Sequence, residues 1–237
     1  MKVIWHDLEC GSYRKDLPLW RVLAERHGGP ILDIGAGTGR TAIALARAGH
    51  AVTALDSDPE LLAELSRRSA GLVLQTTLAD ARELALGRRF ALCIVPMQTI
   101  QLLGGSPGRA RFLTRLRGHL REGGVAAVAL ADELDVFEVR AGDPAPLPDV
   151  CELDGVVYSS RPTAVRSDGD GFLLERRRET VTTDGELFGE DDLVRLDRLS
   201  PAALEAEATA VGLCPVGREL IAPTEDYVGS VVVMLGA

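Results

Sequence analysis

Apolar runs of four to six residues alternate with longer helical patterns through the first half of the chain. Their richness in Val, Ile, Leu and Ala is typical of buried strands, and the segments between them repeat apolar residues every three or four positions, as helices do. This alternation predicts a doubly wound α/β fold, in which helices cover both faces of a parallel sheet. The predicted strands lie at residues 31–34, 51–55, 72–76, 90–95 and 125–130, with two more at 215–221 and 228–235.

Capping and turn residues mark where the predicted helices begin and end. Asp58, Ser106 and Ser200 each stand directly before a proline, which suits an N-cap followed by proline at the first helical position. We expect the helix that begins at Ser106 to end at the pair Gly123 and Gly124.

The pattern changes after residue 132. Alternating polar and apolar residues, with hairpin-type turns at Asp168-Gly169 and Asp184-Gly185, indicate an antiparallel insert of three or four strands over residues 155–199. The patterns divide the chain into a helical lead-in at residues 1–29, a core at residues 30–132 and 200–237, and an insert region at residues 133–199.

Composition and charge narrow the range of partners. The formal net charge of −9 opposes binding to nucleic acid, because that affinity comes mostly from Lys and Arg neutralising phosphates. The sequence has no apolar run long enough to span a membrane, and its start lacks the build of a signal peptide. Its four cysteines form no Cys-x-x-Cys pair. We therefore expect a cytoplasmic protein without a nucleic-acid, membrane or metal partner.

The most specific motif is the segment Asp33-Ile34-Gly35-Ala36-Gly37-Thr38-Gly39, at the end of the first predicted strand. Ligands of open α/β sheets bind at such strand–helix junctions, where glycines let the backbone approach and the helix N-terminus offers N–H groups. A close-packed turn without a ligand is the alternative. The segment does not match the dinucleotide pattern Gly-x-Gly-x-x-Gly, because the residue after Gly39 is Arg40 and the third glycine comes too early.

Three acidic residues accompany the ends of three successive predicted strands. Asp33, Asp56 and Asp80 would all lie at one edge of a parallel sheet. There, Asp56 can accept hydrogen bonds from both hydroxyls of a ribose, and Asp80 one from an adenine amino group. Taken alone, Asp56 beside Ser57 and Asp58 would read as a turn former. The coincidence of all three carboxylates is what favours a nucleoside site.

Together these residues resemble the class I S-adenosylmethionine-dependent methyltransferase family, in its small-molecule branch. The resemblance covers residues 30–130, the last helix and the two final strands. It implies a Rossmann-like, mostly parallel seven-stranded sheet with an antiparallel β insert after the fifth strand, and S-adenosyl-L-methionine as the cofactor. It further implies that the glycine loop lies under the methionine part, with Asp56 on the ribose and Asp80 near the adenine. The implied cofactor-binding residues are Asp33, Gly35, Ala36, Gly37, Gly39, Asp56, Ser57, Asp80, Ala81, Val95 and Pro96.

The segment at residues 94–102 resembles the family's loop that borders the transferred methyl group. It departs from the Asn-Pro-Pro-Tyr loop of members that methylate nucleic acids and protein amides, and this favours a small-molecule substrate. The predicted substrate-binding residues are Met97, Gln98 and Gln101, with Tyr13 from the lead-in. The alternatives are core packing for Met97, a solvated helical face for the two glutamines and a surface position for Tyr13.

No residue stands out as a catalytic base. A neutral amine acceptor needs none, whereas a hydroxyl or carbon acid does, and His6 is the first candidate before Glu9 and Asp226. Two other functions remain open: a protein that binds the cofactor without methyl transfer, and an NAD(P)-dependent oxidoreductase. The insert is expected to be either a substrate cover or a homodimer contact.

Overall fold

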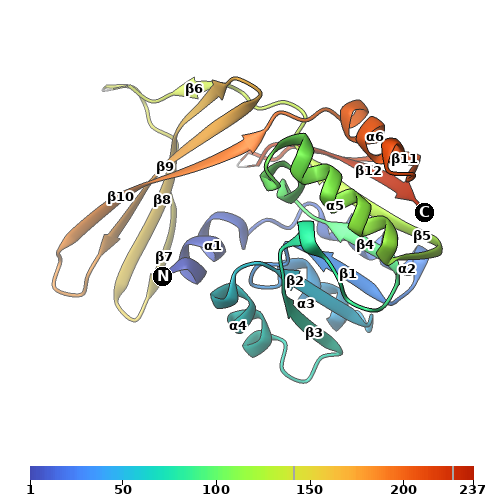
Figure 1. The fold of residues 1–237 in the computed structure, drawn as a ribbon. Coiled ribbons are helices and arrows are strands. Elements are labelled where there is room, and N and C mark those ends of the chain that lie inside the picture. The colour runs from blue at the N-terminus through green and yellow to red at the C-terminus, as the bar shows by residue number, and fades with distance from the viewer. Residues whose placement is uncertain (141, 226) are drawn as a thin grey trace. The chain divides into compact units, whose positions relative to one another are not determined.

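The structure, a computed structural model, describes residues 1–140, 142–225 and 227–237 (Figure 1). It contains two compact units. Unit 1 consists of Met1–Ser12 and Glu133–Arg198, and unit 2 of Tyr13–Asp132 and Leu199–Ala237. The lead-in expected at residues 1–29 is therefore divided between them.

Unit 2 is built on a seven-stranded sheet with the strand order β11-β12-β5-β4-β1-β2-β3. Strands β1 to β5 pair in parallel, whereas β12 runs antiparallel to both β5 and β11. This confirms the predicted doubly wound fold. The strands are β1 (Ile31–Ile34), β2 (Val52–Asp56), β3 (Leu74–Leu78), β4 (Phe90–Val95), β5 (Leu120–Leu130), β11 (Cys214–Ile221) and β12 (Ser230–Gly236).

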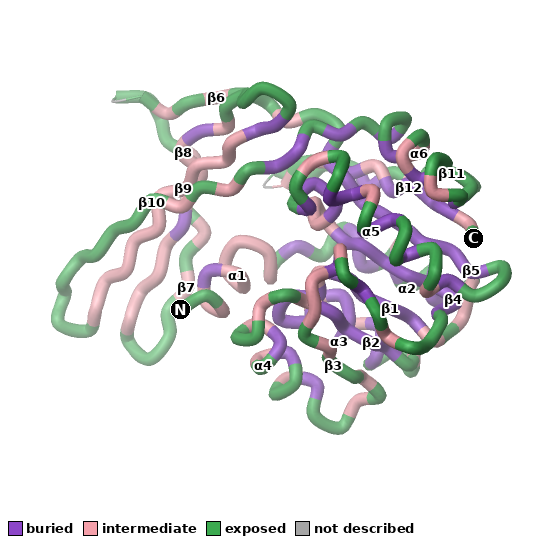
Figure 2. The backbone as a smooth tube through the Cα atoms, viewed as in Figure 1, coloured by how far each residue is buried: buried purple, intermediate pink, exposed green. Residues whose placement is uncertain are grey.

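Helices cover both faces of this sheet, and alternate strand residues face the two layers. In β4, Leu92 and Ile94 belong to a cluster that contains Trp20 of α2, while Cys93 and Val95 belong to one that contains Phe112 of α5. The central strands are consequently buried along their length (Figure 2). The helices of unit 2 are α2 (Leu17–His27), α3 (Arg40–Arg47), α4 (Pro59–Arg68), α5 (Gly105–His119) and α6 (Pro201–Ala210), with short 3₁₀ turns η1 (Ala81–Glu83) and η2 (Thr99–Leu102).

Both predicted ends of α5 were wrong. The helix begins at Gly105 with Gly104 as its N-cap, so Ser106 lies inside the first turn instead of capping it. The helix ends at His119, and Gly123 and Gly124 lie inside β5. The pairing register of β5 with β4 shifts at this place, and a Cβ on Gly124 would come within 2.8 Å of the Phe90 carbonyl oxygen. The two glycines thus permit an irregularity in the strand, which is a common use of glycine in sheets.

Unit 1 is an antiparallel sheet with one helix, α1 (Lys2–Cys10). The strand order is β10-β9-β8-β6, and β7 also pairs with β8. The predicted hairpin turns join β8 to β9 and β9 to β10, with φ of 56° at Gly169 and 85° at Gly185. The insert therefore exists as predicted, but begins earlier than residue 155. Its strands are β6 (Phe137–Glu138), β7 (Asp149–Leu153), β8 (Val156–Asp168), β9 (Gly171–Val181) and β10 (Leu187–Asp197).

Helix α1 packs on this sheet through a mixed aromatic and ionic contact. The Trp5 ring meets the Tyr158 ring edge-on at 5.5 Å, and the Arg178 guanidinium lies 5.5 Å from the Trp5 ring centroid. Glu9 accepts hydrogen bonds from Arg178 at 2.8 and 2.9 Å. Among the described residues, no helix in either unit has the length and apolar character needed to cross a membrane.

Candidate functional site

The glycine loop connects β1 to α3 at the carboxyl end of the sheet. Gly35, Gly37 and Gly39 all have positive φ, at 73°, 55° and 96°, where a side chain would add strain. The N–H groups of Gly35 and Ala36 donate to the Leu55 carbonyl oxygen at 2.9 and 3.0 Å, which ties the loop to the end of β2. Since α3 begins directly after Gly39, the unpaired N–H groups of its first turn belong to the same junction.

The glycines also let neighbouring side chains pack onto the loop. A Cβ on Gly35 would lie 2.6 Å from the side chain of Thr99, and one on Gly39 would lie 2.8 Å from Cγ of Leu65. Thr99 itself donates its hydroxyl to the Pro96 carbonyl oxygen at 3.0 Å. The segment after β4 is therefore seated against the glycine loop, a contact that the glycine pattern alone did not indicate.

Asp33 lies beneath this loop and is fully buried. Neither of its carboxylate oxygens meets the geometry of a hydrogen bond within the described residues, although the backbone N–H of Ala42 lies close enough to lower the pKa of the group. Burial raises the pKa of Asp33 to about 7, opposed by the nearby charge of Arg40 and reinforced by those of Asp16 and Asp56. Buried carboxylates normally have donors, so Asp33 is an exception among the described residues.

Asp56 is the last residue of β2, the strand that pairs with β1 next to the glycine loop. Its Oδ2 accepts from the N–H of Gly37 at 2.8 Å, and its Oδ1 from the N–H of Asp58 at 2.9 Å. The carboxylate is thereby fixed between the glycine loop and the N-terminus of α4, and each oxygen keeps a lone pair for a ligand hydroxyl. Ser57 is exposed beside it, and Asp58 caps α4 as its sequence predicts.

Asp80 follows β3 and is the N-cap of η1. Its carboxylate accepts a hydrogen bond from the N–H of Arg82 at 2.8 Å. Its carboxylate also pairs with the Arg82 guanidinium at 2.5 Å. This hydrogen bond holds the pKa of Asp80 below its ordinary value. Ala81 is buried behind it. The arginine partner was not foreseen, although its position two residues later is visible in the sequence.

The segment after β4 has an unusual backbone. Val95 and Pro96 are buried, and Met97 adopts φ of 56°, a left-handed conformation that is uncommon for a residue other than glycine. Gln98 is partly exposed at the start of η2. Such conformations cost energy and persist where the surroundings impose them, often at functional sites.

Gln101 is only 1% exposed, so the alternative of a solvated helical face was wrong for this residue. Its side-chain oxygen accepts from the N–H of Ala131 at 2.8 Å, and its side-chain nitrogen donates to the Ala131 carbonyl oxygen at 3.1 Å. Gln101 therefore links η2 to the end of β5.

Tyr13, expected to bind substrate, is buried within unit 2. Its ring packs 4.8 Å from that of Tyr227, and the Arg40 guanidinium lies 5.2 Å from its centroid. Its hydroxyl makes no hydrogen bond to a described residue, and burial raises the pKa of Tyr13 to about 12. The adjoining ion pair of Arg40 with Asp16 at 2.5 Å was missed, because 24 residues separate the partners and no local pattern connects them.

The base candidates belong mostly to unit 1. His6 lies 3.8 Å from Asp7, and Glu9 accepts hydrogen bonds from Arg178 and Ser160. Although burial raises the pKa of Glu9, these hydrogen bonds outweigh it and lower the value. The Glu9 carboxylate is thus ionised, and both of its oxygens already accept hydrogen bonds within unit 1. Asp226 lies outside the described residues.

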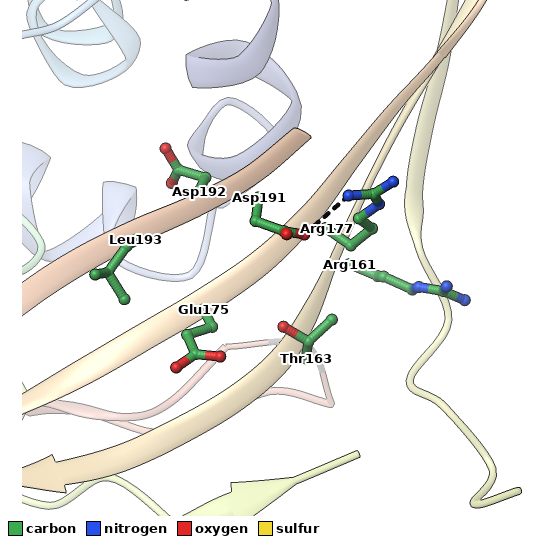
Figure 3. Close-up of a pocket in the computed structure, with 7 residues that line it drawn as sticks. All are labelled: Arg161, Thr163, Glu175, Arg177, Asp191, Asp192 and Leu193. Carbon is green, nitrogen blue, oxygen red and sulfur yellow. Dashed lines mark hydrogen bonds and ion pairs between the residues drawn. The ribbon is translucent and has the colours of Figure 1, made fainter. Parts of the chain in front are cut away.

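A groove of about 530 Å³ lies on the three-stranded part of the sheet in unit 1 (Figure 3). It contains none of the predicted site residues. Arg177 of β9 forms an ion pair with Asp191 of β10 at 3.0 Å, as Figure 3 shows, and faces Arg161 of β8 in the strand register. Within the described ranges, no cluster of side chains has the make-up of a metal site. The groove is lined by Arg161, Thr163, Glu175, Arg177, Asp191, Asp192 and Leu193.

Comparison with known proteins agrees with this geometry. Residues 31–124 match the methyltransferase domain family. The chain is 28% identical over 116 residues to the cypemycin N-terminal methyltransferase of a Streptomyces species. The aligned region covers 49% of this chain and 47% of the relative, so the chain spans about half the length of that protein.

Two solved structures share the fold over nearly the whole chain. The amino pentose methyltransferase CalS10 from Micromonospora echinaspora, solved with bound cofactor, has a TM-score of 0.72 at 18% identity and covers 98% of this chain and 96% of its own. The sugar N-methyltransferase KedS8 from a Streptoalloteichus species has a TM-score of 0.71 at 21% identity, covering 98% and 91%. The glycine loop and the sheet order agree with the methyltransferase-domain match at residues 31–124, and the chain is similar to S-adenosylmethionine-dependent methyltransferases in that region.

Proposed function

We propose that this chain transfers the methyl group of S-adenosyl-L-methionine to a small-molecule acceptor, with an amine nitrogen as the nucleophile. The observation that carries the proposal is the buried Asp33 carboxylate, which lacks a hydrogen-bond partner of good geometry within the described residues and stands two residues before Gly35 of the glycine loop. The cofactor carries an ammonium and a sulfonium group, so carboxylates at this edge of the sheet suit its charge. When bound, it supplies an electrophilic methyl group.

The cofactor site that we propose follows the sheet edge from β1 to β4. The N–H groups of the glycine loop and of the first turn of α3 would receive the amino-acid part, and Asp56 the ribose hydroxyls. Asp80 and the buried Ala81 would border the adenine. Val95 and Pro96 would close the site near the sulfur, with Met97, Gln98 and Tyr13 toward the acceptor.

The amine acceptor is supported by the named similarities. The cypemycin enzyme acts on an N-terminus, KedS8 is a sugar N-methyltransferase and CalS10 acts on an amino pentose. A neutral amine attacks without a base, so the task of the chain is to orient it and exclude water. This agrees with the state of Glu9, which is held in an ion pair with Arg178. His6 stays a candidate only for an acceptor that must lose a proton first.

We also propose that the groove face of unit 1 forms a homodimer contact. Arg161 and Arg177 lie there with Glu175 and Asp191, and a face that carries both signs of charge suits a two-fold interface. Sedimentation analysis of the wild type and of Arg161→Glu would show a dimer that the variant weakens; a monomeric wild type contradicts the proposal. We further propose a cytoplasmic location, which the thiols of Cys93, Cys151 and Cys214 support because such thiols persist in reducing compartments; cell fractionation tests it.

The function is tested first by calorimetric titration with S-adenosyl-L-methionine and, separately, with NADH. We expect micromolar binding of the former alone, and a loss of at least tenfold in Asp56→Ala, because that carboxylate is fixed at the glycine loop. Binding of NADH alone would contradict the proposal. Turnover with a panel of amino sugars and peptide amines then distinguishes an enzyme from a protein that binds the cofactor without transfer.

A further inference from the structure

Thr99, the first residue of η2, lies against the glycine loop. A Cβ on Gly35 would come within 2.6 Å of both Cγ2 and Oγ1 of Thr99, so this side chain occupies the place where any other residue would carry its own. From the other side, the Leu55 carbonyl oxygen of β2 accepts from the N–H groups of Gly35 and Ala36. Because β1 lies between β4 and β2 in the sheet, the loop that follows β1 is held from both neighbouring strands.

The hydroxyl of the same side chain acts on the segment that follows β4. It donates to the Pro96 carbonyl oxygen at 3.0 Å and so closes a turn around Met97, whose φ is 56°. A residue other than glycine adopts this conformation at a cost in free energy, and contacts from its surroundings have to hold it there. A threonine hydroxyl that bonds to the backbone three residues earlier is such a contact.

The 3₁₀ turn that carries Thr99 is itself anchored. The backbone N–H of Gln101 donates to the Gln98 carbonyl oxygen at 2.8 Å. The Gln101 side chain is buried and hydrogen-bonded to both backbone groups of Ala131, directly after β5. Moving Thr99 away from Gly35 would therefore disturb buried hydrogen bonds, which is costly.

We propose that Thr99 is a positioning residue of the cofactor site with two separable roles. Its methyl group supports the glycine loop at Gly35, and its hydroxyl holds the segment of Pro96 and Met97 in the left-handed turn. The inference rests on the proposed function, in which the glycine loop receives the amino-acid part of the cofactor and Pro96 borders its sulfur. One side chain then sets the spacing between the two segments on either side of the transferred methyl group.

Two substitutions in the full chain separate the two roles. Thr99→Val keeps the shape that packs on Gly35 and removes the hydroxyl, whereas Thr99→Ser keeps the hydroxyl and removes the methyl group. Affinity is measured by calorimetry with S-adenosylhomocysteine, which binds without reacting. The turn is monitored in the ligand-free protein by NMR of the methionine methyl groups. Of the three methionines, Met97 reports on the turn, and Met234 in β12 is the internal reference.

Each variant should change one readout and spare the other. Thr99→Ser should weaken S-adenosylhomocysteine binding by about fivefold, because one packed methyl group is lost, and should leave the Met97 signal in place. Thr99→Val should move or split the Met97 signal, since Met97 packs against a cluster that contains the rings of Trp20 and Tyr13. The same variant should change the affinity by less than about twofold.

A threonine that only fills space would give a different pattern. Thr99→Val and Thr99→Ser would then change both readouts together or change neither, and any pattern other than the expected split overturns the inference. If Thr99→Val does not fold, Thr99→Ala takes its place, and an unmoved Met97 signal in that variant contradicts the role of the hydroxyl. Thr114→Val and Thr114→Ser are the matched controls. Thr114 is exposed, its hydroxyl donates to the Ala110 carbonyl oxygen at 2.8 Å, and neither readout should change.

Failure of the inference can be told apart from failure of the proposed function. A wild type that binds neither S-adenosylmethionine nor S-adenosylhomocysteine refutes the function itself. The Met97 signal is recorded without ligand and still tests the role of the hydroxyl in that case. A wild type that binds both compounds, together with a Thr99→Ser variant of unchanged affinity, overturns the inference and leaves the function standing.

Discussion

At the scale of single residues, function and stability oppose each other at Asp33. The carboxylate is fully buried, and no described side chain or backbone group meets it with good hydrogen-bond geometry. Such a group destabilises the folded chain whenever it is ionised, because its charge has lost the solvation it had in the unfolded state. A ligand cation would restore the missing interaction. The free protein should therefore be less stable because of a residue that serves binding.

The variant Asp33→Asn measures this cost. The folded-state pKa of about 7 lies above the ordinary value of 3.8, so the native state binds the extra proton between these values. The contribution of Asp33 to stability accordingly falls as pH rises through that window and is constant above it. We expect Asp33→Asn to be more stable than the wild type by roughly 2–4 kcal/mol at pH 8, with little difference at pH 4. Urea unfolding at several pH values tests this; a difference independent of pH contradicts it.

Gln101 makes a structural contact that its position in the sequence did not indicate. Gln101→Met keeps the volume but leaves the N–H and carbonyl groups of Ala131 buried without their partners. We expect a loss of about 2–4 kcal/mol in unfolding free energy. Gln98→Met is the matched control, since that side chain is partly exposed, and it should change stability by less than about 0.5 kcal/mol. Equal effects of the two variants would show that the Ala131 contact is unimportant.

At the scale of secondary-structure elements, local capping signals fixed several helix starts. Asp58 caps α4 by accepting from Glu60 and Leu61, and Ser200 caps α6 by accepting from Ala203. Each precedes a proline at the first helical position, where no N–H is needed. These signals act over three or four residues, which is why the sequence predicts them well.

The cap of α6 provides a quantitative test. Ser200→Ala removes the acceptor for the Ala203 N–H at 3.2 Å and should cost about 1 kcal/mol, a decrease in Tm of roughly 2–4 °C for a chain of this size. The control, Thr209→Ala, lies near the exposed end of the same helix and should leave Tm nearly unchanged. A Tm of Ser200→Ala equal to that of the wild type would mean that Pro201 and packing alone define the helix start.

At the scale of the whole molecule, the negative net charge and the carboxylates at the sheet edge favour the same class of ligand. The formal charge of −9 repels phosphate polymers, while Asp33, Asp56 and Asp80 concentrate carboxylates at the carboxyl ends of the strands. A small cationic ligand suits both properties, and a nucleic acid suits neither.

Ligand binding should consequently be visible in global stability. At a hundredfold excess over its dissociation constant, S-adenosylmethionine should add about 2.7 kcal/mol and raise Tm by roughly 5–10 °C. Differential scanning fluorimetry measures the shift, with equal concentrations of NADH and of adenosine as comparison ligands. No shift with S-adenosylmethionine, or an equal shift with NADH, would contradict the proposed site.

The sequence by itself determined the order of elements in the core and the place of the glycine loop. Strand periodicity, N-caps and the motif from Asp33 to Gly39 are local, and the carboxyl ends of parallel strands must meet at one edge, so Asp56 and Asp80 could be placed from sequence. The glycines at 123 and 124 misled the prediction, because the same residue serves to end a helix and to distort a strand.

Only the tertiary structure decided which side chains are buried together. Arg40 and Asp16 are 24 residues apart, Gln101 and Ala131 are 30 apart, and no periodic pattern connects either pair. The division of the first 29 residues between the two units is likewise not marked by any local pattern in the sequence. Long-range contacts depend on how elements pack, and packing selects partners by shape and charge after the local structure has formed. That is why the chemistry at Asp33, which is set by its surroundings, could not be predicted from the motif that contains it.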